Sequence, residues 1–117
     1  MQVSTEERRR YQRVTAPAIT IQVDDVLYQT HDWSMGGFMI EGYEGRLSPG
    51  ALFTLKRIAT LKGDLASVRV PSRVVRADPD RQRLMVGFLA IDEQAYAILS
   101  EHMAVRLRFL KEQQRFS

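Results

Sequence analysis

Between Ala18 and Leu89 the sequence is a series of short apolar segments separated by turn-forming residues, with no helical pattern among them. In the first segment Ile19, Ile21 and Val23 alternate with polar residues, the period-two pattern of a strand with one buried face. Six such segments at hairpin spacing predict a mainly β fold, a six-stranded antiparallel β-barrel, with a two-sheet sandwich as the alternative. The connections are too short for a parallel sheet. The predicted strands cover residues 18–23, 26–30, 38–41, 51–59, 66–76 and 83–89.

The length and composition indicate one globular domain. A chain of 117 residues can bury one hydrophobic core but is too short for two ordinary domains. It contains no cysteine, which excludes disulfides, thiolate metal ligands and cysteine nucleophiles. No apolar run approaches the roughly 20 residues that span a bilayer, and the N-terminus is charged. We therefore expect a cytoplasmic protein.

Residues 92–113 form the only convincing predicted α-helix. Asp92 and Glu93 stand at the end where the helix dipole is positive. The apolar residues of this segment cover roughly half of the helical circumference, more than the ~100° stripe that docks one face. Either the helix is wedged deeply between the barrel and its loops, or part of its surface binds a downstream protein or a second copy of the chain. A homodimer through this helix is one expectation for the partner.

The N-terminal residues carry a cluster of arginines, Arg8, Arg9, Arg10 and Arg13, and no apolar stripe. We expect residues 1–15 to be a flexible basic arm and residues 16–117 to be the barrel domain with its helix. Arginine dominates throughout, since only three of the seventeen basic residues are lysine, and the planar guanidinium suits phosphate and guanine recognition. These arginines favour an anionic partner; a solvated charge run or a compositional bias is the alternative.

The segment from Asp32 to Gly37 contains a carboxylate, a hydroxyl and two adjacent glycines, Gly36 and Gly37, between two predicted strands. The same residue types also make an ordinary turn. Hairpin topology brings this segment back toward the end of the barrel where the arm begins, so that the two can form a guanine and phosphate site. Arginine matches the O6 and N7 acceptors of guanine, a carboxylate accepts from its N1 and N2 donors, and glycine lets the backbone approach the ligand.

The two segments resemble the motif of the PilZ domain family, a bacterial receptor module for cyclic di-GMP. The first half of the motif, Arg-x-x-x-Arg, is similar to Arg9–Arg13, and the second half, Asp-x-Ser-x-x-Gly, to Asp32–Gly37. The resemblance extends through residues 73–76, 78–80 and 86–88 to the final helix, so it covers nearly the whole chain. It implies the barrel of that family.

The resemblance also implies roles for individual residues. Arg9 and Arg13 would bind guanine edges and phosphates. Asp32 and Ser34 would bind the other guanine surfaces and fix the loop, and Gly37 would admit the ligand. In similar proteins an arginine at the position of Arg8 tends to accompany an intercalated pair of ligands. The candidate ligand-binding residues are Arg8, Arg9, Arg10, Arg13, Asp32, Ser34, Gly36 and Gly37.

The function implied by the resemblance is that of an effector with no catalytic residues, cofactor or metal. Binding of cyclic di-GMP, as one molecule or a pair, would order the arm and change the surface shown to a protein partner in motility, chemotaxis or exopolysaccharide production. The alternatives are a nucleic-acid-binding barrel, a ligand-independent adaptor, and an enzyme that uses His31 or His102. The sequence disfavours an enzyme because it shows no nucleophile–base pair, and His31 and Asp32 should point to opposite faces of a continued strand.

Overall fold

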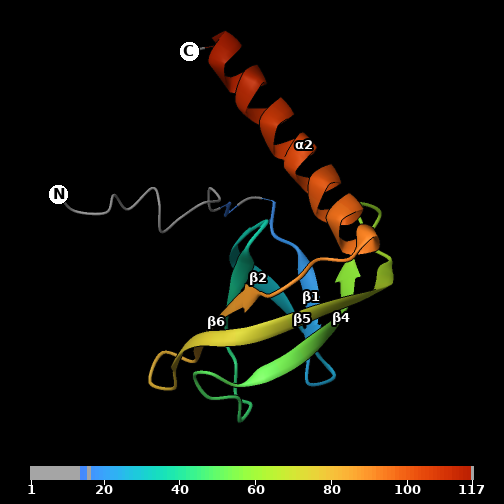
Figure 1. Ribbon diagram of the computed structural model, residues 1–117. Coiled ribbons are helices and arrows are strands. Elements are labelled where there is room, and N and C mark those ends of the chain that lie inside the picture. Colours follow the sequence, from blue (N-terminus) through green and yellow to red (C-terminus); the bar gives the residue numbers. More distant parts are fainter. Residues whose placement is uncertain (1–13, 16, 117) are drawn as a thin grey trace, which may run out of the picture.

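The computed structural model describes residues 14, 15 and 17–116. Within this part of the chain six antiparallel strands close into a barrel, in the spatial order β1-β2-β3-β6-β5-β4, and one helix follows them (Figure 1). The elements are β1 (Thr20–Val23), β2 (Val26–Ser34), β3 (Gly37–Glu41), β4 (Leu52–Ala59), β5 (Leu65–Asp78), β6 (Arg83–Phe88) and α2 (Glu93–Phe116). The six-stranded antiparallel barrel predicted from the sequence is confirmed.

The N-terminal strands form the predicted hairpin, closed by Asp24 and Asp25. Both aspartates have positive φ, 52° and 63°, and Val23 pairs with Val26. Positive φ at both loop positions is the requirement of the two-residue turn that matches the twist of a hairpin, and aspartate tolerates it better than most residues. The Tyr43 hydroxyl donates a 3.0 Å hydrogen bond to Asp24. Burial raises the pKa of Tyr43, so the phenol remains a donor at neutral pH.

Strand alternation separates the core from the outer face. Trp33, Phe38, Val86 and Val74 are cross-strand partners on β2, β3, β6 and β5 and form one row across the inside of the barrel. Each of the four is 1% exposed. Because successive side chains of a strand point to opposite faces, this inner row fixes which neighbours face outward.

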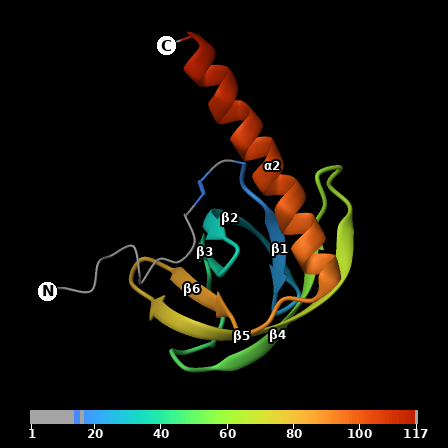
Figure 2. The ribbon, with the colours of Figure 1, turned by 45° about the horizontal axis from the view of Figure 1, so that its top comes forward.

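Helix α2 packs against the barrel with its first half only. Asp92 caps it, because one carboxylate oxygen accepts from the Ala95 backbone N–H and the other from that of Arg69, at 2.8 Å each. The buried positions Ala95, Ile98, Leu99 and His102 follow the helical spacing of a docking face. After His102, no side chain that the structure describes is buried, and the helix extends away from the barrel (Figures 1 and 2). The deeply wedged helix considered above is therefore found only in this first half.

The packing of β3 on β6 gives a test of the barrel's tolerance. An alanine Cβ at Gly37 would collide with the backbone oxygen of Val86, whereas one at Gly87, the cross-strand partner, would lie 3.2 Å from a methyl of the exposed Val75. Gly37→Ala should lower the free energy of unfolding by about 1–3 kcal/mol or more, since a backbone atom cannot yield easily. Gly87→Ala should change it by less than ~1 kcal/mol. Urea unfolding of both variants checks this, and equal losses would contradict it.

Candidate binding site

Asp32 and Ser34 belong to β2 and face the outside of the barrel, on either side of the inward-facing Trp33. The sequence pattern assigned them to a connection between strands, but only Met35 and Gly36 form the turn. The turn chemistry is nevertheless present, because the Ser34 hydroxyl accepts a 3.0 Å hydrogen bond from the Gly36 N–H. The Asp32 side chain is 13% exposed. The Asp32 side chain therefore lies on the outer face of the barrel but is mostly covered by its neighbours.

A β-bulge in β2 determines the direction of Asp32. The pairing of β2 with β3 shifts register between Thr30 and Asp32, leaving His31 as the extra residue. The sequence predicts that His31 and Asp32 point to opposite faces of the strand. Because of the bulge, they do not. The His31 ring lies between two carboxylates, with Nδ1 3.4 Å from Asp32 and Nε2 3.4 Å from Glu41. The sequence expectation was wrong because it assumed unbroken alternation.

The N-terminal chain reaches this strand end through Val14. Val14 and Trp33 exchange two backbone hydrogen bonds, of 2.7 and 2.9 Å, and form an isolated antiparallel bridge. The indole Nε1–H of Trp33 also donates to the Pro17 carbonyl, at 2.7 Å. Val14 is 2% exposed, so a residue expected from the sequence to lie in the arm belongs to the core. The residue following Arg13 is thus hydrogen-bonded to the residue between Asp32 and Ser34.

The remaining sequence candidates divide into two groups. Arg8, Arg9, Arg10 and Arg13 lie outside the described residues. Gly36 and Gly37 lie directly beside Ser34, where the Gly36 carbonyl accepts a 2.8 Å hydrogen bond from the Phe88 N–H. Gly37 has a structural reason to be glycine, since the approach of β3 to β6 leaves no room for a Cβ. Its expected role in admitting a ligand stays a prediction.

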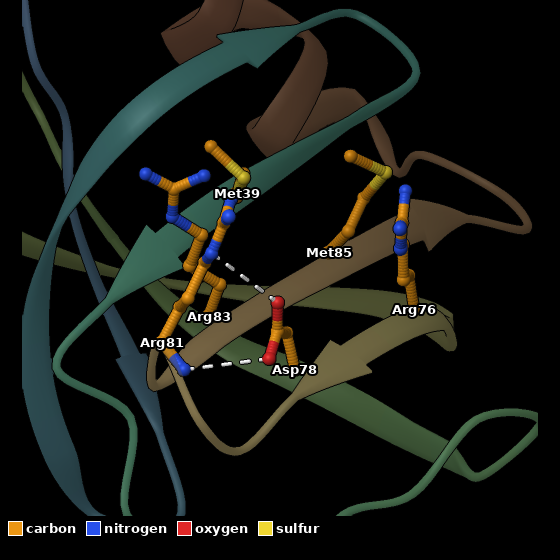
Figure 3. Close-up of a pocket in the computed structure, with 6 residues that line it drawn as sticks. All are labelled: Met39, Arg76, Asp78, Arg81, Arg83 and Met85. Carbon is orange, nitrogen blue, oxygen red and sulfur yellow. Dashed lines mark hydrogen bonds and ion pairs between the residues drawn. The ribbon is translucent and has the colours of Figure 1, made fainter.

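A small cavity opens on the outer face of β3 and β6, and the sequence motifs do not indicate it. It has a volume of about 180 Å³. Its lining comes from β3, β6, the end of β5 and the loop after it (Figure 3). The residues are Met39, Arg76, Asp78, Arg81, Arg83 and Met85. The period-two pattern does identify Met39, Arg83 and Met85 as outward-facing, but no motif singles them out.

Two properties of the described residues bear on the function. No group of three or more histidine, cysteine or carboxylate side chains among them is placed to hold a metal ion. No helix in this part of the chain is long and apolar enough to cross a membrane.

These features define the class as a small closed β-barrel whose strand end holds a carboxylate, a hydroxyl and a glycine turn beside the N-terminal chain. The family model described as the PilZ domain matches residues 7–105, and the chain belongs to this family. The resemblance seen in the sequence is therefore confirmed. No curated protein is similar enough in sequence to count as a match.

Three solved structures are similar in fold. The inhibitor of motility MotI/DgrA of Bacillus subtilis superimposes with a TM-score of 0.61 at 18% identity, over 92% of this chain and 53% of its own. YcgR of Escherichia coli, crystallised in complex with c-di-GMP, superimposes with a TM-score of 0.63 at 19% identity, over 92% of this chain and 50% of its own. The PilZ domain of CeSA from a cellulose-synthesizing bacterium superimposes with a TM-score of 0.53 at 19% identity, over 81% of this chain and 98% of its own. The chain spans about half the length of the first two.

The Trp33 contacts predict what holds the N-terminal chain to the barrel. Trp33→Phe removes the donor to Pro17 and leaves a partly buried carbonyl without its partner, so it should cost about 1–3 kcal/mol and speed hydrogen exchange of the Val14 amide. The control is Phe38→Leu, which shrinks the neighbouring core residue without touching that hydrogen bond. In the Trp33→Phe variant, amide exchange at Val14 should accelerate by a larger factor than amide exchange in β5. Equal acceleration of all amides in both variants would contradict this prediction.

Proposed function

We propose that this chain is a cytoplasmic, non-enzymatic effector that binds cyclic di-GMP between its N-terminal arginines and the Asp32–Gly37 segment. The single observation that supports this most is the pairing of Val14 with Trp33. It attaches the chain immediately after Arg13 to the residue that separates Asp32 from Ser34. Membership of the PilZ domain family and the similarity to YcgR, whose crystal structure contains c-di-GMP, point to the same ligand.

The proposed chemistry divides the ligand between two kinds of group. Arg9 and Arg13 supply charge-assisted donors to phosphates and to the O6 and N7 edge of guanine, and Arg8 and Arg10 add positive charge. Asp32 supplies an acceptor for the guanine N1 and N2 donors. Its 13% exposed position strengthens such hydrogen bonds, because little water competes for the carboxylate. Ser34 holds the turn through its hydrogen bond from Gly36 and thereby keeps the glycines in place.

The two histidines support a binding role over catalysis. His102 is buried, and its Nε2–H donates to the Ala59 carbonyl at 3.0 Å, which makes it a packing residue between α2 and the barrel. The ring nitrogens of His31 face the carboxylates of Asp32 and Glu41, and neither contact brings a hydroxyl or thiol nucleophile to the imidazole. We therefore propose that the ligand is bound and released unchanged.

The proposed output is a change in the surface shown to a partner. Trp33 connects the N-terminal chain with α2. Its backbone is hydrogen-bonded to Val14, and its ring meets the His102 ring of α2 edge-on, with centroids 6.1 Å apart. Ligand binding would order the arm against β2 and alter the position of Trp33, and α2 would carry that change to its exposed half. The partner would act in motility, chemotaxis or exopolysaccharide production. Two of these processes agree with the similar proteins, an inhibitor of motility and a domain from a cellulose-synthesizing bacterium.

The ligand assignment predicts the effect of removing one arginine. Arg13→Ala should weaken binding of cyclic di-GMP about ten- to a hundredfold, the loss of a charge-assisted hydrogen bond of ~1.5–3 kcal/mol. Arg108→Ala, which removes the same charge from the exposed part of α2, should bind like the parent. Isothermal titration calorimetry measures both, and its stoichiometry distinguishes one ligand from an intercalated pair. Unchanged affinity of Arg13→Ala would refute the assignment.

The exposed half of α2 predicts self-association. Leu107 is 54% exposed on the part of the helix that extends beyond the barrel. If this surface joins two copies of the chain, Leu107→Glu should dissociate the dimer in analytical ultracentrifugation because it would bury an unpaired charge. Leu61→Glu, at an exposed leucine in the turn between β4 and β5, should leave the dimer intact. A parent protein that stays monomeric at high concentration would exclude the homodimer.

A further inference from the structure

The outer face of four neighbouring strands carries one continuous row of side chains. Asp32 on β2 pairs with Met39 on β3, Met39 pairs with Met85 on β6, and Met85 pairs with Arg76 on β5. These are the outward counterparts of the inner row that begins with Trp33. The row therefore starts at the carboxylate of the proposed nucleotide site and ends at a guanidinium three strands away.

Both ends of this row are charged, and both stand directly after a β-bulge. Register shifts between Thr30 and Asp32 in β2 and between Val74 and Arg76 in β5. Without the second bulge, alternation from the buried Val74 would turn Arg76 inward; with it, Val75 and Arg76 are both exposed. Bulges re-aim side chains and are frequent beside binding sites. Here they turn a carboxylate and a guanidinium toward the same surface.

The cavity beside this row has room for part of a ligand. At about 180 Å³ it is smaller than the ~300–1,000 Å³ of pockets that enclose a drug-sized molecule, so it suits one ring system. Asp32 and Arg76 are three strand spacings apart, about 14 Å, which is wider than a single base. A ligand that reaches both therefore needs two recognition groups, as a dinucleotide has.

Among the described arginines that line the cavity, Arg81 and Arg83 face carboxylates and Arg76 does not. Arg81 lies 4.0 Å from Asp78, and Arg83 makes a 3.2 Å contact with Glu41. The Arg76 side chain has no hydrogen bond or ion pair within the described part of the chain. Figure 3 shows it beside the thioether of Met85, away from the paired arginines. A guanidinium in this state can bind a guanine edge or a phosphate without first breaking a salt bridge.

The two methionines supply an apolar surface at the centre of the row. Met39 and Met85 are partly buried, pair across β3 and β6, and line the cavity together. Thioethers are polarisable and make favourable contacts with aromatic rings, and methionine adapts its shape to a bound partner. A purine lying on this pair would have Arg76 at one side and the Asp32 end of the row at the other.

We infer that Met39, Met85 and Arg76 form the second half of the nucleotide site, which binds the guanine that Asp32 does not. This inference deepens the proposed function and depends on it. The methionines contact the face of the second base, and Arg76 donates to its O6 and N7 edge. The site is thus a surface across β2, β3, β6 and β5 rather than the motif segments alone.

The affinity test compares two arginines of β5. Arg76→Gln should weaken binding of cyclic di-GMP tenfold or more in calorimetry, whereas Arg69→Gln, which removes an exposed charge from the outer face of the same strand, should bind like the parent. Circular dichroism establishes that both variants fold. Parent-like affinity of Arg76→Gln, while Arg13→Ala loses binding, overturns this inference and leaves the proposed function standing. A parent protein that does not bind cyclic di-GMP overturns both.

The contact test uses the methionine methyl groups in the parent protein. Nuclear Overhauser effects from guanine H8 to the methyls of Met39 and Met85 are expected in the complex, and none to Met103 on α2. Absence of these effects at both methionines in a saturated complex overturns the inference whatever the affinity of the arginine variants. A single-stranded oligonucleotide that produces them in place of cyclic di-GMP would assign the row to nucleic acid and overturn it as well.

Discussion

The pairing of Val14 with Trp33 is the constraint on which the proposed site depends. It fixes the backbone of a residue whose side chain lies in the core and whose two neighbours face outward. The Trp33 side chain fills the barrel, so Asp32 and Ser34 must face outward. Its backbone N–H and C=O are satisfied by Val14, and its indole N–H by Pro17. A slip of β2 by one residue would bury the carboxylate and expose the indole. Burying an unpaired carboxylate costs several kcal/mol, so the register is strongly determined.

The fold could be predicted from the sequence because its signal is local. Short apolar or alternating segments separated by turn residues identified all six strands, and Asp24-Asp25 identified the first turn. The end of β2 could not be predicted in the same way. Asp32 and Ser34 have the composition of a turn, and they are held in a strand by partners that lie far away in the sequence, Val14 and β3. Contacts with distant residues override local preference at such positions.

The site was predictable only as far as its motif. Asp32, Ser34 and the glycines could be named from their order along the chain, but the bulge that turns His31 and Asp32 to one face leaves no pattern in the sequence. Arg76 shows the same difficulty, since strict alternation from Val74 directs it into the core. The row that joins it to Asp32 depends on the pairing of β3 with β6, in which Met39 lies opposite Met85, a residue far away in the sequence. Sequence reasoning lacks that register until the barrel is closed.

The position of His102 suggests how a ligand bound at the surface could affect α2 without entering the core. Its Nε2–H donates to the Ala59 carbonyl, and its buried Nδ1 has no hydrogen bond within the described part of the chain. An unsatisfied buried nitrogen costs free energy that offsets the Nε2 hydrogen bond, so the helix is held here mainly by packing against Trp33 and its neighbours. Close-packed interiors do not deform continuously, and a displaced indole requires its neighbour to move. Because α2 is buried only up to His102, the proposed displacement of Trp33 would be carried along the helix to the part that has no barrel beneath it.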